Sequence, residues 1–226
     1  MAGKLLSISR NPRSISALKG GFVFFLALRF LADPSWEWGA LYVFLAAIFY
    51  SRPIFNISGT FPLFSAIISL PFFLRPDSFP FQFLLAFSVA VSYVILLGVK
   101  NLALTHREWW THCVSYFVSY LFFLSFFGAS SPSFVLSWVF AFIFLYCVFR
   151  TVIPDRHVAM IVTLFAAETL WIVSWLPVGY LSSANFMLLI TLFLSDVAHE
   201  GKVTLRNQVL FPVLSFVIAA SSYWQL

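Results

Sequence analysis

Glu168 is the residue of this sequence whose type and position are best suited to chemistry inside a membrane. It lies in the apolar run Thr163–Trp171 and precedes the turn residue Pro177 by nine positions, which at ~1.5 Å per residue is ~13 Å of helix. Asn185 follows the same turn by eight positions, so the two side chains should share a depth on adjacent antiparallel helices. Because charge near the centre of a bilayer is costly, we expect Glu168 to face other helices rather than lipid.

Two interpretations of this pair stay open. Glu168 and Asn185 could form a site for a proton, a cation or another ligand, because ionisable groups inside membranes commonly mark such sites. The pair could equally be a hydrogen-bonded clamp that holds two helices together.

A second group of candidate residues gathers in the breaks between apolar stretches, on the side assigned below to the cytoplasm. Histidine and carboxylate side chains are suitable metal ligands or acid–base catalysts, and the group consists of Asp155, His157, Asp196, His199, Glu200, His106 and His112. Asp196 lies one helical turn from both His199 and Glu200 if the helix continues that far. The spacing matches no metal-binding motif, so we predict neither a metal site nor a particular cofactor. Ordinary solvated residues at a membrane face are the simpler interpretation.

The composition is that of a membrane protein. Apolar residues make up 62% of the 226 residues and charged residues 9%, whereas a soluble domain carries roughly 25% charged residues. We therefore expect an all-α, polytopic integral membrane protein, a single transmembrane domain over residues 1–226 with about eight or nine transmembrane helices. The expected spans are 16–32, 38–51, 58–74, 79–99, 113–128, 133–149, 158–176, 179–195 and 208–224. The first two could instead form a re-entrant or tilted pair, which leaves the number of crossings within residues 16–74 open.

The distribution of Lys and Arg predicts the orientation of these spans. If the N-terminus is cytoplasmic and the spans alternate, 11 of the 13 basic residues lie on the cytoplasmic side, and the other two are Arg29 and Arg75. The sequence thus predicts a short basic cytoplasmic tail over residues 1–15 and, in a prokaryotic cell, a multi-pass protein of the plasma membrane. Because the basic residues behind the net charge of +5 flank apolar spans, we expect contact with the lipid bilayer and not with nucleic acid.

No motif that we recognise in the sequence identifies a reaction or a substrate, and three hypotheses follow from the candidate residues. The first, which we prefer at this stage, is a small permease or ion-coupled carrier that uses Glu168 and Asn185 as its site near the membrane centre. The second is a membrane-embedded enzyme that acts on a lipid-linked substrate with the histidine and carboxylate groups of the cytoplasmic rim. The third is a structural or assembly subunit that binds a membrane-protein partner or a second copy of the chain.

Overall fold

The structure, a computed structural model, describes residues 12–52, 57–73, 78–101, 104–128, 134–176 and 179–200, together with positions 209, 211–215 and 217. These residues are 91% helical and include no β-strand. Five of the helices are long and apolar enough to cross a membrane, over Ser14–Ala32, Phe79–Lys100, Arg107–Gly128, Arg156–Ser174 and Tyr180–His199. The expectation of an all-α protein with several membrane-spanning helices is therefore confirmed.

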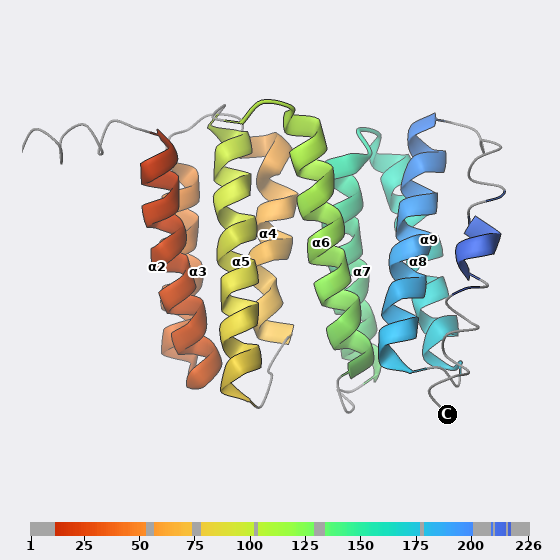
Figure 1. Cartoon of the computed structure of the whole chain (residues 1–226), viewed down its shortest axis with the longest axis horizontal. Coiled ribbons are helices and arrows are strands. Elements are labelled where there is room, and N and C mark those ends of the chain that lie inside the picture. The colour runs from red at the N-terminus through yellow and green to blue at the C-terminus, as the bar shows by residue number, and fades with distance from the viewer. Residues whose placement is uncertain are drawn as a thin grey trace, which may run out of the picture. The chain divides into compact units, whose positions relative to one another are not determined.

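Eight helices follow one another along the described chain (Figure 1). They are α2 (Pro12–Ala32), α3 (Trp36–Ser51), α4 (Ile57–Phe73), α5 (Phe79–Lys100), α6 (Arg107–Gly128), α7 (Phe134–Val152), α8 (Arg156–Ser174) and α9 (Tyr180–Glu200). Each lies within a few residues of one of the first eight apolar stretches expected from the sequence. The largest difference is at α6, which begins at Arg107 instead of 113 and so contains both residues of the Trp109–Trp110 pair. The ninth expected span, 208–224, falls largely outside the described residues.

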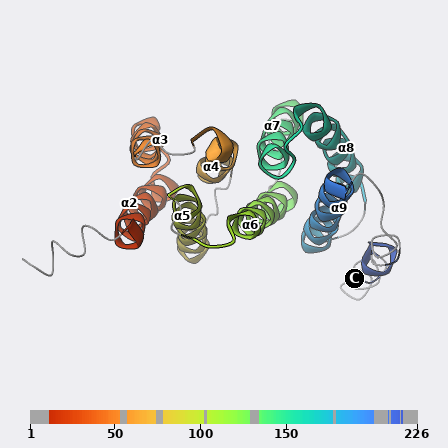
Figure 2. The ribbon, with the colours of Figure 1, turned by 90° about the horizontal axis from the view of Figure 1, so that it is seen from above.

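The chain divides into two compact units, Met1–Val114 and Ser115–Leu226, and the boundary falls within α6. In the first unit α2 packs most extensively against α5, while α3 packs against α2 and α4 against α5. Seen end-on, α2 and α5 form one layer of this unit, and α3 and α4 form a second layer (Figure 2). In the second unit α8 packs against both α7 and α9.

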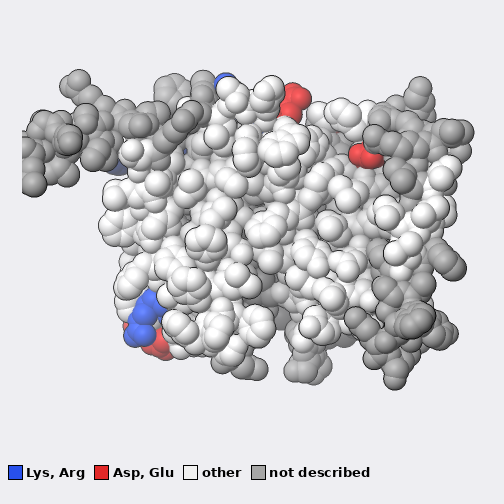
Figure 3. Space-filling model, viewed as in Figure 1, with Lys and Arg blue, Asp and Glu red and all other residues white. Residues whose placement is uncertain are grey.

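The exposed side chains between the helix ends are mostly large and apolar. Phe25 on α2, Phe44 on α3 and Phe87 on α5 are examples. On the face that Figure 3 shows, the coloured Lys, Arg, Asp and Glu atoms lie near the ends of helices, and uncharged side chains cover the surface along the helices. Such a surface suits lipid tails, which cannot solvate charge.

Hydroxyl groups connect the helices of the second unit. Tyr116 on α6 bonds to Ser195 on α9, with their oxygens 3.0 Å apart. Ser115 on α6 bonds to Thr151 on α7, with 3.2 Å between the oxygens. Polar contacts of this kind contribute to helix association in membranes, where apolar burial gives little driving force because lipid is as apolar as the side chains.

The close packing of α2 on α5 depends on Gly20. A Cβ atom added to Gly20 would overlap the Cγ2 atom of Val94 and would lie 3.6 Å from the carbonyl oxygen of Ala90. The next residue, Gly21, has nothing within 4 Å of the corresponding position. The missing side chain at Gly20 therefore sets how closely the two helices approach, as small residues often do between membrane helices.

Gly20→Ala should destabilise the first unit, because the added methyl group overlaps a β-branched side chain whose rotamer is restricted. Overpacking of this kind costs roughly 1–3 kcal/mol, which equals or exceeds the ~1 kcal/mol that alanine gains over glycine in a helix. Thermal unfolding of the purified protein in detergent should show a lower midpoint for this variant than for Gly21→Ala.

Gly21→Ala is the matched control and should be neutral or slightly stabilising, since it gains helix propensity without a clash. Val94→Ala should recover part of the stability lost in Gly20→Ala, because it removes the overlapping methyl group. Equal unfolding midpoints for the two glycine variants would contradict a close approach of α2 and α5 at this point.

Candidate functional site

Glu168 lies on the exposed side of α8 and does not turn toward the other helices that the structure describes. Its carboxylate makes no hydrogen bond or ion pair with any residue in the described ranges, including Asn185, which is half-buried on α9. The buried side of α8 instead carries small residues, among them Ala159, Thr163 and Ala166. The expectation that Glu168 faces other helices is therefore not met by the described helices of its own chain, because the small-residue side of α8 packs against them. A ligand-binding role for Glu168 and Asn185 stays a prediction.

The residues of the expected cytoplasmic rim have separate local roles. Asp155 precedes α8 and caps it, since its carboxylate accepts hydrogen bonds from two backbone N–H groups of the first helical turn, at 2.8 and 3.3 Å. The hydrogen bond from the N–H group of His157, and to a lesser extent that from Val158, holds the pKa of the Asp155 carboxyl below its usual value. His157 and His199 are exposed, Asp196 is half-buried and Glu200 ends α9. Among the residues that the structure describes, no three His, Cys, Asp or Glu side chains form a group that could hold a metal ion.

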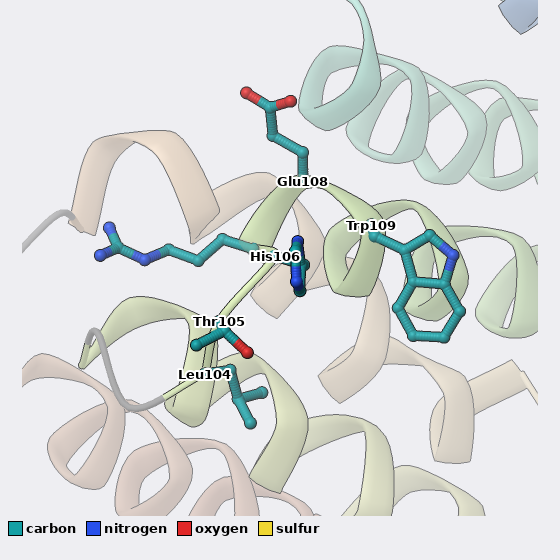
Figure 4. Close-up of a pocket in the computed structure, with 6 residues that line it drawn as sticks. Leu104, Thr105, His106, Glu108 and Trp109 are labelled. Atoms are coloured by element: carbon teal, nitrogen blue, oxygen red, sulfur yellow. The ribbon is translucent and has the colours of Figure 1, made fainter.

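A surface hollow lies at the start of α6 (Figure 4). Its lining is one consecutive run, Leu104, Thr105, His106, Arg107, Glu108 and Trp109. His106 has a φ of 54°, a left-handed conformation that turns the chain into α6. The side chains of Glu108 and Trp109 point in different directions (Figure 4). The hollow is thus a feature of one turn and unites no residues from separate elements, and His112 lies one to two turns further along α6.

The first unit holds a polar site that the sequence analysis did not single out, at the C-terminal end of α3. The Nζ atom of Lys19 donates hydrogen bonds to the carbonyl oxygens of Phe49 and Arg52, at 2.8 and 2.6 Å. Lys100 is fully buried, and its Nζ donates to the carbonyl oxygen of Tyr50. The same ammonium group lies 4.3 Å from the centre of the Tyr50 ring, a cation–π contact. Two lysines from α2 and α5 therefore meet at one helix end.

This arrangement satisfies the backbone groups that a helix leaves open at its end. The last carbonyl groups of a helix have no partner within it, and an unsatisfied polar group in lipid costs several kcal/mol. Ser51 Oγ donates to the carbonyl oxygen of Ile48 at 2.9 Å, so side chains reach the carbonyl groups of residues 48, 49, 50 and 52. Positive charge is also favourable at the negative end of a helix dipole.

Tyr50 is fixed by its side chain as well as by its backbone. Its hydroxyl oxygen lies 2.6 Å from Oγ1 of Thr60 on α4. Its ring stacks on Phe64, with 4.2 Å between the ring centres. One turn away, the hydroxyl of Tyr93 on α5 donates to the carbonyl oxygen of Ala46 on α3 at 2.9 Å. These bonds join α3, α4 and α5 around the lysine-bound helix end.

Lys19 and Lys100 are among the 11 basic residues on which the predicted orientation rests. A usable signal was their position, since Lys19 lies inside an expected apolar span and Lys100 follows one directly. A lysine in such a place needs a protein partner or must reach the membrane surface.

Tyr93→Phe should lower the free energy of unfolding by about 0.5–1.5 kcal/mol, because it removes a buried hydrogen bond between α5 and α3. Chemical or thermal unfolding in detergent, followed by circular dichroism, measures the loss.

Tyr42→Phe is the matched comparison. The hydroxyl of Tyr42 is also fully buried, yet it has no hydrogen-bond partner among the described residues. Its removal should leave stability unchanged or raise it, since a buried polar group without a partner costs free energy. A loss in Tyr42→Phe as large as that in Tyr93→Phe would refute this difference between the two tyrosines.

No protein family, curated protein or solved structure matches this chain. Its own residues and their geometry are therefore the basis for assigning a function.

Proposed function

We propose that this chain is an assembly subunit of the membrane, which binds a second copy of itself through the exposed side of α8. The observation that carries the proposal is the position of Glu168, an acidic residue within an apolar helix that is exposed and lies away from the other described helices of the chain.

The exposed side of α8 forms one continuous stripe. Ile161, Phe165, Glu168 and Ile172 follow one another at intervals of three or four residues and are all exposed. Residues at this spacing lie on the same face of a helix. Glu168 is thus a single polar group in the middle of an apolar helix face. Polar side chains in such positions commonly form hydrogen bonds between membrane helices.

The depth of Glu168 makes a partner energetically useful. The residue lies six positions before Ser174, the last residue of α8, which is ~9 Å along the helix axis. Translocon insertion scales assign roughly 2.5–3.5 kcal/mol to an aspartate at the centre of a membrane helix, and a glutamate should be similar. A hydrogen bond to a second chain offsets part of such a cost.

The same carboxyl group of a second copy is a suitable partner. A protonated carboxyl both donates and accepts a hydrogen bond, so two of them complement each other. Two-fold symmetry about the membrane normal brings the same helix face of both copies together. A dimer through α8 would therefore pair Glu168 with Glu168.

The exposed position of Glu168 supports assembly more than the two other hypotheses. A carrier with its site inside this chain needs the carboxylate among its own helices, and the exposed position favours assembly instead. No particular observation supports the rim as the catalytic site of an enzyme.

The proposal includes a topology of eight or nine crossings with the N-terminus in the cytoplasm. It rests on the 11-to-2 distribution of basic residues. Because α5 separates Ser78 from Thr105, and both residues are exposed, they report on the two ends of one span.

Single cysteines at Ser78 and Thr105 should react from opposite sides of the membrane, in a background without the free thiols of Cys113 and Cys147. In intact cells an impermeant maleimide should label Ser78→Cys, and it should label Thr105→Cys only after permeabilisation. The reverse pattern would place the N-terminus outside, and labelling of both from one side would show that α5 does not cross.

Glu168→Leu should weaken dimerisation by roughly 3- to 30-fold, the equivalent of about 0.6–2 kcal/mol for a hydrogen bond between membrane helices. Glu168→Gln should dimerise nearly as well as the wild type, since an amide also donates and accepts. Energy transfer between labelled copies in liposomes, measured over a range of dilution, gives the dissociation constants.

Disulfide cross-linking locates the interface independently. Leu164→Cys places a thiol on the exposed face of α8, and Phe87→Cys places one on an exposed face of α5 as the matched control. Oxidation should give covalent dimers with Leu164→Cys and none with Phe87→Cys. Equal dimerisation of Glu168→Leu and wild type, without cross-linking at Leu164→Cys, would rule out this surface.

A further inference from the structure

We propose that the lysine-bound end of α3 is a binding site for an anionic phospholipid, whose phosphate lies at Lys19 and Arg52 and whose acyl chain follows the exposed face of α2. The inference concerns the first unit and is independent of dimerisation through α8.

The charges at this helix end are not balanced by carboxylates of the described residues. Lys19, Lys100 and Arg52 bring three positive charges, while the end of a helix contributes only about −0.5 charge. None of the three forms an ion pair with a carboxylate in the described ranges. By contrast, Arg29 near the other end of α2 is paired with Asp33, at 3.5 Å. About 2.5 positive charges thus remain for an external anion.

Two of the three cations can be reached from outside. Arg52 is exposed and Lys19 is half-buried, whereas Lys100 lies fully buried behind them. No hydrogen bond of the Arg52 side chain to a described residue is present, so its guanidinium can take a phosphate in the two-pronged geometry that arginine favours. Lys100 contributes positive potential without contact.

An apolar track begins directly below these cations. Leu18, Phe22 and Phe25 lie on one face of α2, and they are 66%, 52% and 61% exposed. The Phe22 ring lies against Phe49 of α3, with 5.9 Å between ring centres, so the track reaches the same helix end whose carbonyl groups bind Lys19. A charged head above an apolar track matches the shape of a phospholipid and not that of a free anion, and basic sites between membrane helices are known to hold such headgroups.

The test compares phosphatidylglycerol with phosphatidylcholine on the full-length protein in mixed micelles, with retained lipid counted by native mass spectrometry. Phosphatidylglycerol should be retained and phosphatidylcholine should not. Arg52→Gln should weaken retention about fivefold, as expected for one basic residue at an anionic lipid. Arg156→Gln is the matched control, because Arg156 is likewise exposed but starts α8 in the second unit, and it should bind as the wild type does.

Lys19→Gln should also weaken retention, while Lys19→Arg should keep it, since arginine preserves the charge. Circular dichroism identifies any variant that has lost its helical fold. If Lys19→Gln does not fold, Arg52→Gln still tests the site, because Arg52 is exposed and its substitution should not disturb the fold. Equal retention of the two lipids, or equal losses in Arg52→Gln and Arg156→Gln, would overturn the proposal. Complete displacement of phosphatidylglycerol by excess inorganic phosphate would also overturn it, because the site would then belong to a free phosphate.

Discussion

The end of α3 shows the constraint on which the first unit depends: a helix must find donors for its last carbonyl groups where it ends. An unsatisfied backbone group costs several kcal/mol in lipid, so donors from the chain itself are favourable in a membrane protein. Ser51 supplies one donor locally, and Lys19 and Lys100 supply the others from α2 and α5. These bonds require both helices to lie beside α3, and the close approach permitted by Gly20 brings the two helices together. Backbone chemistry at one helix end thus constrains the arrangement of three helices.

Charged residues of the described helices are accommodated in different ways. Lys19 and Lys100 are held by carbonyl groups of their own chain. Arg29 pairs with Asp33 and lies over the ring of Trp38, 5.1 Å from its centre, near a helix end where such contacts supplement water. Glu168 has no partner among the described residues. The lysines and Arg29 thus bond to groups of their own chain, whereas Glu168 makes no such bond among the described residues.

The two surfaces proposed to bind partners differ in their chemistry. The exposed face of α8 is apolar with one carboxyl group. This suits a second helix, because a protonated carboxyl can both donate and accept a hydrogen bond. The lysine-bound end of α3 carries positive charge beside the apolar face of α2. This combination suits a phospholipid, because the positive charge attracts its phosphate and its acyl chain covers the exposed phenylalanine side chains. Neither surface was evident from the composition, which differs little from one helix to another.

The sequence by itself determined the helical, apolar character of the chain and the positions of eight helices within a few residues, except at the start of α6. Charge density, proline and capping residues such as Asp155 are local signals, and they act through the nearest residues. The direction in which Glu168 points was not determined in this way. Both sides of α8 are apolar, with Phe165 and Ile172 exposed and Val162 and Leu170 buried, so hydrophobicity could not identify the inward side.

Small residues were the better signal for that side, because close packing, and not apolarity, marks the buried face of a helix in lipid. Ala159, Ala166 and Ala167 are all fully buried on α8, and Glu168 lies off their stripe. Only the tertiary structure could decide the role of Lys100. Its partner, the Tyr50 carbonyl, lies fifty residues away in the chain, and no local pattern encodes which helix end a buried lysine will meet.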